Sequence, residues 1–255
     1  MEYLHHAAEN NVRHAEIFFD PQAHTSRGVA FETFINGLYR ATVDARALHV
    51  DARLIMCFLR DLSRESARKT LEESLPYRDK FIGVGLDSDE HNNPPMKFFN
   101  QFTQAEQYGL HLTAHADIDQ KDSIEHIRDL LEVIGVERID HGTNIVEDPD
   151  LVEYAAKHHI GFTTCPLSNT FVRPEMKGPE VLELLAKGVK VSAHSDDPAY
   201  FGGYISDNYY ALADAFNLTK EQVVTLARNS FETSWISDEQ KAIYIAELEE
   251  YARTH

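Results

Sequence analysis

Histidine, aspartate and glutamate residues follow several short apolar runs in this 255-residue sequence. Each run has the composition of a β-strand, and the residues after it are of types that bind metals or transfer protons. Ligands of α/β proteins bind at the carboxyl ends of the strands, so these are the residues that chemistry would use. The groups that follow the runs are Asp20–His24, Asp87–Glu90, His115–Asp117, Asp140–Gly142, Cys165–Asn169 and His194–Pro198.

Imidazole and carboxylate groups at converging strand ends suit a zinc ion that keeps one position open for water. Zinc can lower the pKa of bound water to about 7, and a nearby histidine can orient that water or take its proton. His115, His141 and Asp196 all stand at predicted strand ends. These three residues are therefore the candidates for a metal site.

Simpler structural roles compete with this interpretation. A single strand histidine such as His14 or His111 is expected to be a hydrogen-bonded core residue, and Asp196–Pro198 could cap a helix or start a turn. Cys165 is expected to be a buried, unreactive thiol. Ser168–Asn169 lacks the Gly-x-Ser-x-Gly context of a serine hydrolase.

The runs that position these residues are nearly continuous apolar segments, typical of strands buried on both faces of a parallel sheet. Helical periodicity lies between them, including Phe34–Leu48 and Asp122–Ile134, and Thr219 with Gln222 is typical of a capping box. Seven strands that alternate with helices predict parallel βα units. The predicted strands are His14–Phe19, Arg53–Phe58, Phe81–Asp87, His111–Ala116, Arg138–His141, Gly161–Cys165 and Val189–His194.

Two architectures fit this α/β pattern, an open doubly wound sheet and a (β/α)8 barrel. No glycine-rich phosphate loop follows the first strand, which weighs against a nucleotide-binding sheet. Seven units is one fewer than a closed barrel has. The length fits one barrel or two ordinary domains.

Composition excludes several classes of protein. The 42 Asp and Glu against 24 Lys and Arg give a net charge of −18, which argues against a nucleic-acid partner. Two distant cysteines exclude a disulfide scaffold and fit a reducing compartment. No apolar run reaches the roughly 20 residues of a membrane span, and the polar N-terminus is unlike a signal peptide. We expect no membrane partner and a cytoplasmic location, with a nuclear one also open in a eukaryote; the oligomeric state stays open.

Five motifs occur in an order that identifies a family. They are HAEIFFDPQ at 14–22, GLDS at 85–88, RIDHG at 138–142, CPLSN at 165–169 and SDDPAYFGGY at 195–204. The chain resembles the adenosine/adenine deaminase family of zinc-dependent purine aminohydrolases, especially its adenine-deaminase branch. The resemblance implies a (β/α)8 TIM-type barrel of the metal-dependent hydrolase type, a single domain over residues 1–255.

The resemblance also implies roles for particular residues. His115 and Asp196 match ligands of the one zinc ion (Zn²⁺), and His141 matches the catalytic histidine that helps to deprotonate the attacking water. The implied reaction is attack of zinc hydroxide on C6 of a purine, with loss of ammonia, or of an amine where N6 is substituted.

The implied partner is a small-molecule purine base. Asp197 matches the carboxyl group that binds purine N7, and Ser88 and Glu90 match the stretch that lines the purine pocket. The adenine branch closes the space that a ribose would need. Adenine or an N6-alkyl adenine is therefore expected over adenosine.

The first departure from the family concerns its opening strand, which carries a His-x-His pair of zinc ligands. No stretch of this sequence matches that pair, so we expect the first βα unit to be absent, which accounts for the count of seven. Two ligands are fewer than the three or more of a tight zinc site. Weak or absent zinc is the expectation for these 255 residues alone.

The other departures lie beside the substrate. Ile118 stands where the family has a glutamate that protonates purine N1. Asp117 has the strand parity of His115, so we expect it to be the catalytic acid, with Asp119 as the alternative. His194 replaces an asparagine that is usual in the family.

Three functions remain open at this point. The first is a zinc-dependent deaminase of adenine or N6-substituted adenine. The second is a non-catalytic purine-binding or interaction protein of the same family that has lost its metal site. The third is an amidohydrolase of a non-purine, which would make the match of Asp197 a coincidence.

Overall fold

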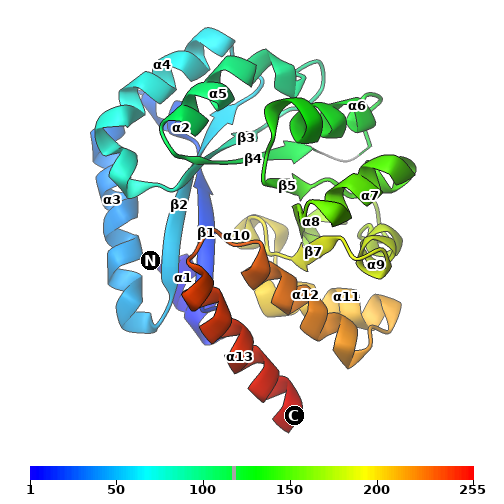
Figure 1. The fold of residues 1–255 in the computed structure, drawn as a ribbon. Coiled ribbons are helices and arrows are strands. Elements are labelled where there is room, and N and C mark those ends of the chain that lie inside the picture. The colour runs from blue at the N-terminus through cyan, green and yellow to red at the C-terminus, as the bar shows by residue number, and fades with distance from the viewer. Residues whose placement is uncertain (117–118) are drawn as a thin grey trace. The chain divides into compact units, whose positions relative to one another are not determined.

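The computed structural model describes residues 1–116 and 119–255 of the chain. They form two compact units: the first is Met1–Ala116 with Glu125–Glu137, and the second is 119–124 with Arg138–His255. Each unit consists of parallel strands with helices between them (Figure 1). The single domain over residues 1–255 stays a prediction.

The first unit contains four parallel strands that pair in chain order. Phe19 lies opposite Met56, and Leu59 lies opposite Asp87. Five consecutive residues of β2, 54–58, are buried, which is the pattern of a strand covered on both faces. The strands are β1 (His14–Phe19), β2 (Asp51–Leu59), β3 (Gly83–Asp87) and β4 (His111–Ala116).

Helices connect the strands of the first unit, and α3 lies along β2 (Figure 1). α3 begins at Phe31, and η1 continues it to Leu48, so the helix predicted over Phe34–Leu48 is confirmed with an earlier start. The helices are α1 (Glu2–Glu9), α2 (Pro21–Thr25), α3 (Phe31–Asp44), η1 (Ala45–Leu48), α4 (Arg64–Ser74), η2 (Leu75–Lys80), η3 (Pro95–Phe98), α5 (Phe99–Gln107) and η4 (Asp129–Ile134), with α6 (Ser123–Arg128) at the boundary of the units.

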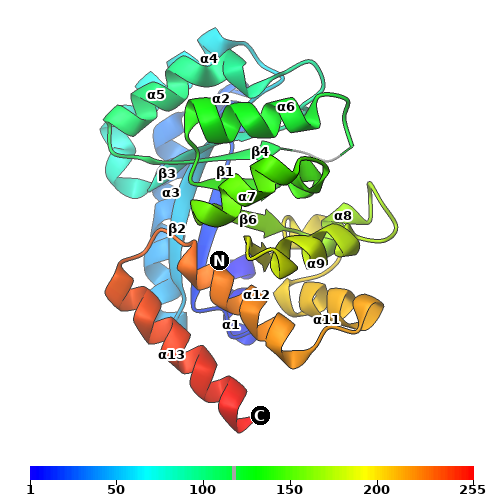
Figure 2. The ribbon, with the colours of Figure 1, turned by 45° about the vertical axis from the view of Figure 1, so that its right-hand side comes forward.

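The second unit contains three parallel strands, β5 (Arg138–His141), β6 (Gly161–Thr164) and β7 (Lys190–Ala193). α12 packs against β7 and against α13, beside which it lies in Figure 2. The predicted capping box of Thr219 and Gln222 opens α12. The helices are η5 (Thr143–Glu147), α7 (Pro149–Lys157), α8 (Pro166–Asn169), α9 (Gly178–Ala186), α10 (Pro198–Phe201), α11 (Ile205–Phe216), α12 (Lys220–Glu232) and α13 (Asp238–Thr254).

All seven predicted strands are present among the described residues: three have the predicted ends, and the ends of the other four differ by no more than two positions. The helix predicted over Asp122–Ile134 differs more: an α-helix ends at Arg128, and a π-helical turn follows to Ile134. Leu130, Leu131 and Ile134 are all buried in this turn, and Gly135 ends it with φ of 79°. Nowhere in residues 1–116 and 119–255 is a helix long and apolar enough to cross a membrane.

His14, at the start of β1, lies in a buried cluster of charges. Its Nδ1 is 2.9 Å from Asp51 Oδ2 and its Nε2 is 3.0 Å from Glu16 Oε1, and its side chain is 4% exposed. Both ring nitrogens must donate to carboxylates, which requires the imidazolium form. Burial opposes this form, but the hydrogen bonds to Asp51 and Glu16 outweigh burial and raise the pKa of His14. The bond from His14 in turn lowers the pKa of Asp51.

His111, at the start of β4, also has a carboxylate partner, because its Nδ1 lies 2.9 Å from Glu137 Oε2. This pair is exposed, with 42% of the His111 side chain accessible to solvent. His14 is therefore a hydrogen-bonded core residue, as predicted. The core role predicted for His111 is wrong, because its pair with Glu137 lies at the surface.

We expect His14→Gln to lower the free energy of unfolding by about 1–3 kcal/mol near pH 5.5 and by less near pH 9. The folded pKa of His14 is raised, so its contribution is present below the unfolded pKa of about 6.5 and is lost as pH rises through the folded value. The lowered pKa of Asp51 means that its charged form also stabilises the folded protein. This contribution to the free energy of unfolding is fully present above the unfolded pKa of about 4 and is lost as pH falls through the folded value. Urea unfolding at several pH values measures both.

His111→Gln is the matched control, since the same change removes an exposed pair. It should alter the free energy of unfolding by no more than about 1 kcal/mol at either pH. A loss from His14→Gln that is as large near pH 9 as near pH 5.5 would contradict the assignment of a charged, buried His14.

Candidate functional site

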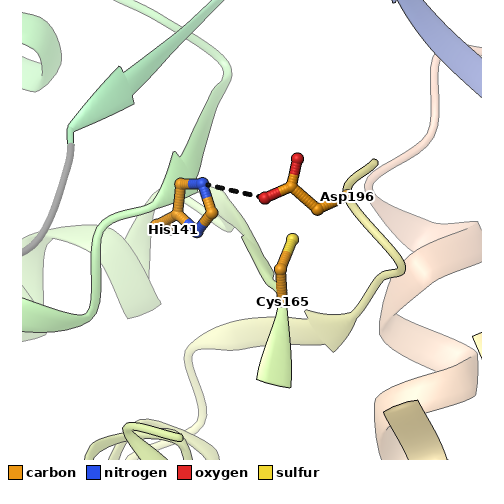
Figure 3. Close-up of side chains that lie close together, drawn as sticks. All are labelled: His141, Cys165 and Asp196. Atoms are coloured by element: carbon orange, nitrogen blue, oxygen red, sulfur yellow. Dashed lines mark ion pairs between the residues drawn. The ribbon is translucent and has the colours of Figure 1, made fainter. Parts of the chain in front are cut away.

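The carboxyl ends of β5, β6 and β7 bring together an imidazole, a thiol and a carboxylate (Figure 3). His141 is the last residue of β5, Cys165 follows β6, and Asp196 follows β7. Nε2 of His141 is 3.7 Å from Oδ2 of Asp196, and the possible ligand atoms of the three residues lie within 4.8 Å of one another. These are donor types that zinc accepts. The strand-end argument thus predicted the proximity of His141 and Asp196 correctly.

Backbone conformation sets the direction of these side chains. His141 has φ of 59° and Asp196 has φ of 55°, in the left-handed region that residues other than glycine rarely adopt. Such a conformation costs about 1–3 kcal/mol at each residue and persists where the surrounding structure holds it. Nine further non-glycine residues among those described also have positive φ, so this conformation alone does not mark a functional site.

Cys165 is the unreactive member of the group. Burial raises the pKa of its thiol well above the usual range, and the negative charges of Asp196 and Asp140 act in the same direction. The protonated thiol is a poor metal ligand because metals bind the thiolate. His141 and Asp196 are therefore the better donors, and the predicted burial of Cys165 is confirmed.

His115 belongs to β4 of the first unit, and its ring is held by several contacts. Nδ1 donates a hydrogen bond to the carbonyl oxygen of Leu86 at 3.1 Å. The ring also meets Phe18 edge-on, with centroids 5.5 Å apart. With Nδ1 held by this carbonyl, Nε2 is the nitrogen with which a neutral ring would bind a metal. His115 fits the predicted role of ligand, and that role stays a prediction.

The three predicted substrate residues differ in exposure. Ser88 is exposed directly after β3 with φ of 78°. Asp197 is exposed at the start of α10, where its carbonyl oxygen accepts hydrogen bonds from the N–H groups of Tyr200 and Phe201, both at 2.9 Å. Glu90 is buried, with 3% of its surface exposed. Their contacts with a purine remain predictions.

A second group of possible ligand atoms lies in the first unit, where Asp20, Cys57 and Asp87 lie within 4.8 Å of one another. Cys57 is fully buried on β2, and a Cβ added to Gly85 would lie 2.6 Å from its sulfur. Gly85 is therefore required by the close approach of Cys57 to β3. The sequence pointed to Asp20 and Asp87 through their places at strand ends but did not point to Cys57.

Asp119, the alternative acid, forms ion pairs with two cations. Lys177 Nζ donates to Asp119 Oδ1 at 2.9 Å, and Arg173 donates to Oδ2. Partial burial opposes ionisation of Asp119, but these hydrogen bonds and positive charges outweigh it and lower the pKa of the carboxyl. An ionised carboxylate held in this way is a poor proton donor. Asp117 lies outside the described residues.

Three buried residues with basic side chains did not emerge from the sequence. Lys177 is 4% exposed and also donates to Asn144 Oδ1 at 3.1 Å, so it joins the chain after β5 to the start of α9. Arg60 follows β2, and His126 lies on α6, and both are buried. The available signal for Arg60 was its place at a strand end; Lys177 and His126 had no such signal.

Parallel strands in sequential order, with imidazole and carboxylate groups at their carboxyl ends, define an α/β protein of the TIM type with a candidate metal site. The chain belongs to the adenosine deaminase family, which it matches over residues 1–251. An adenine deaminase of Cupriavidus metallidurans is 48% identical over 254 residues, covering 98% of this chain and 71% of that protein.

Solved structures agree with this assignment. The crystal structure of adenine deaminase from Arthrobacter aurescens matches with a TM-score of 0.94 and 42% identity, over 99% of this chain and 77% of that one. A zinc-bound amidohydrolase from Burkholderia ambifaria matches with a TM-score of 0.91 and 26% identity, over 99% of this chain and 71% of that one. The resemblance and the TIM-type fold are thereby confirmed, and the absence of a first βα unit stays a prediction.

We expect both cysteines to resist alkylation in the folded protein at pH 7. Cys165 and Cys57 are buried, and the raised pKa of Cys165 leaves little thiolate to react. Mass spectrometry after treatment with a maleimide should find no label on the native chain and two labels in urea. Rapid labelling of Cys165 in the native protein would show that the thiol is accessible and ionised.

Proposed function

We propose that the protein is a hydrolytic adenine deaminase, which exchanges the 6-amino group of a purine base for oxygen and releases ammonia. Family membership and the 48% identity to a bacterial adenine deaminase support hydrolytic deamination. The observation that carries the proposal to this chain's own residues is the approach of His141 to Asp196 at 3.7 Å. Its partner is a small-molecule base, and an N6-substituted adenine would lose an amine by the same route.

The proposed metal is zinc, with His115 and Asp196 as ligands. The imidazole of His115, whose Nδ1 is held by the Leu86 carbonyl, and the carboxylate of Asp196, whose side chain is 20% exposed, suit this ion. When bound, zinc supplies a nucleophile from water at neutral pH. The zinc-bound amidohydrolase of the same fold supports this choice of metal.

The remaining roles belong to the protein's own side chains. His141 Nε2 accepts a proton from the attacking water, for which its place beside Asp196 is suitable. Asp197 binds the base at N7, and Ser88 and Glu90 contact its N3 and N9 edge. Asp117 donates the proton that N1 takes up as C6 is attacked.

We expect Asp117→Asn to reduce kcat for adenine by about 10²–10⁴-fold, because an amide cannot transfer a proton to N1. Zinc content, measured by atomic absorption, should stay the same. Asp119→Asn should reduce kcat much less, since Arg173 and Lys177 already hold that carboxyl ionised. Undiminished turnover by Asp117→Asn would remove it from the mechanism.

We expect kcat/KM for adenine or N6-methyladenine to exceed that for adenosine by about 100-fold or more. A pocket built to hydrogen-bond N3 and N9 of the free base leaves buried polar groups unpaired when a ribose occupies N9. Ammonia or methylamine release measures each rate with the protein as its gene encodes it. A higher kcat/KM for adenosine than for every free base would refute the assignment to adenine while leaving the family intact.

A further inference from the structure

Arg60 is a fully buried arginine at the carboxyl end of β2. Its guanidinium donates from Nη1 to the carbonyl oxygen of His115 at 2.7 Å and from Nε to the carbonyl oxygen of Asn93 at 3.0 Å. Nη2 lies 3.8 Å from Oε1 of Glu90. The backbone carbonyl of Arg60 also accepts a hydrogen bond from Lys97 Nζ at 2.8 Å.

The position of Arg60 in the strand order makes these contacts informative. β3 pairs with β2 on one side and with β4 on the other. The guanidinium therefore reaches past the end of β3 to His115, the penultimate residue of β4. It also contacts the segment that follows β3, through the carbonyl oxygen of Asn93. One side chain thus contacts both the proposed metal ligand His115 and the proposed base-binding residue Glu90.

His126 completes the arrangement from α6. Its Nδ1 donates to Oε1 of Glu90 at 2.6 Å, and it is 5% exposed. The same oxygen lies 3.8 Å from Arg60 Nη2, so a hydrogen bond and an ion pair hold this side of the Glu90 carboxylate. A buried carboxylate held in this way presents a defined orientation, which recognition of a planar base requires.

We propose that Arg60 is a positioning residue that couples the metal ligand His115 to the base-binding residue Glu90, and that His126 is a second positioning residue that acts through Glu90. The inference rests on the proposed function for its two end points. It predicts that Arg60 affects both metal affinity and substrate binding, whereas His126 affects substrate binding alone.

Lysine cannot replace arginine in this role. Arg60 uses three separate nitrogens in a planar fork to reach Asn93, His115 and Glu90. The single ammonium group of a lysine keeps the charge but cannot reach all three oxygens together. Arg60→Lys therefore tests geometry at constant charge.

The experiment compares Arg60→Lys, His126→Gln and wild type in the protein as its gene encodes it. Competition with a chelator measures the dissociation constant of zinc, and steady-state kinetics measure kcat and KM for adenine. For Arg60→Lys we expect the zinc constant to rise about 10–100-fold, as for other residues that support a metal ligand, together with a raised KM. For His126→Gln we expect a raised KM and an unchanged zinc constant.

Arg138→Lys is the matched control, because Arg138 is also buried but begins β5, at the end of the strand opposite His141. Its guanidinium lies over Trp235 at 4.1 Å. Thermal denaturation should show a lower Tm for both arginine variants. Only Arg60→Lys should change zinc affinity.

The double variant Arg60→Lys with His126→Gln provides a further test, because two residues that orient one carboxylate should not act independently. Its rise in KM should be smaller than the product of the two single effects. Independent multiplication of the effects would overturn the shared action on Glu90.

The proposal would be overturned if Arg60→Lys lowered Tm but left the zinc dissociation constant and KM unchanged, because Arg60 would then contribute to stability alone. If Arg60→Lys does not fold, His126→Gln decides: an unchanged KM overturns the proposal. A wild-type protein that neither binds zinc nor deaminates adenine would instead overturn the proposed function, and this inference with it.

Discussion

Parallel pairing of the strands is the constraint on which the rest of the site depends. Residues in neighbouring parallel strands stay in a fixed register, as Leu59 does with Asp87 and Thr164 with Ala193. The strands of each unit therefore finish at one edge, and whatever follows them is brought together there. For this reason the possible ligand atoms of Cys165 and Asp196 lie within 4.8 Å of each other, although the two residues are 31 positions apart in the sequence.

A second constraint follows, because charges collected at such an edge are partly removed from water. A buried charge is tolerated only with a partner that satisfies it. In the first unit, Glu90 lies beside the buried side chains of Arg60 and His126, and in the second, Asp119 lies beside Lys177. Each of these ion pairs joins segments that follow different strands. Burial requires the ion pairs, and the ion pairs in turn fix the geometry of the site.

The sequence predicted the strands well because their signal is local. A run such as that of β2 is apolar over five buried residues, and no distant contact is needed to recognise it. The same local logic placed His141 and Asp196 at strand ends. The π-helical turn at Asp129 escaped prediction because an apolar stripe fits either an α-helix or a wider turn, and packing in the folded protein decides between them.

The supporting residues could not be predicted, because their roles are relations between distant positions. Arg60 and His115 are 55 positions apart, His126 and Glu90 are 36 apart, and Lys177 and Asp119 are 58 apart. Side-chain type shows that an arginine can donate five hydrogen bonds, but only the fold determines which oxygens receive them. A catalytic residue can be recognised from its own type and its place at a strand end. A positioning residue can be recognised only together with the distant residue that it contacts.

The left-handed backbone of His141 lies next to a glycine that packs closely against the apolar core. Gly142, the next residue, has φ of 65°, and a Cβ there would lie 2.6 Å from Ile139 and 2.9 Å from the Phe162 ring. The absence of a side chain lets β5 turn sharply against the core, and this turn follows directly on His141 beside Asp196. Ile139 and Phe162 are both fully buried, so a side chain at position 142 would have to displace the core. The close packing of the apolar core against Gly142 therefore constrains the chain directly after His141.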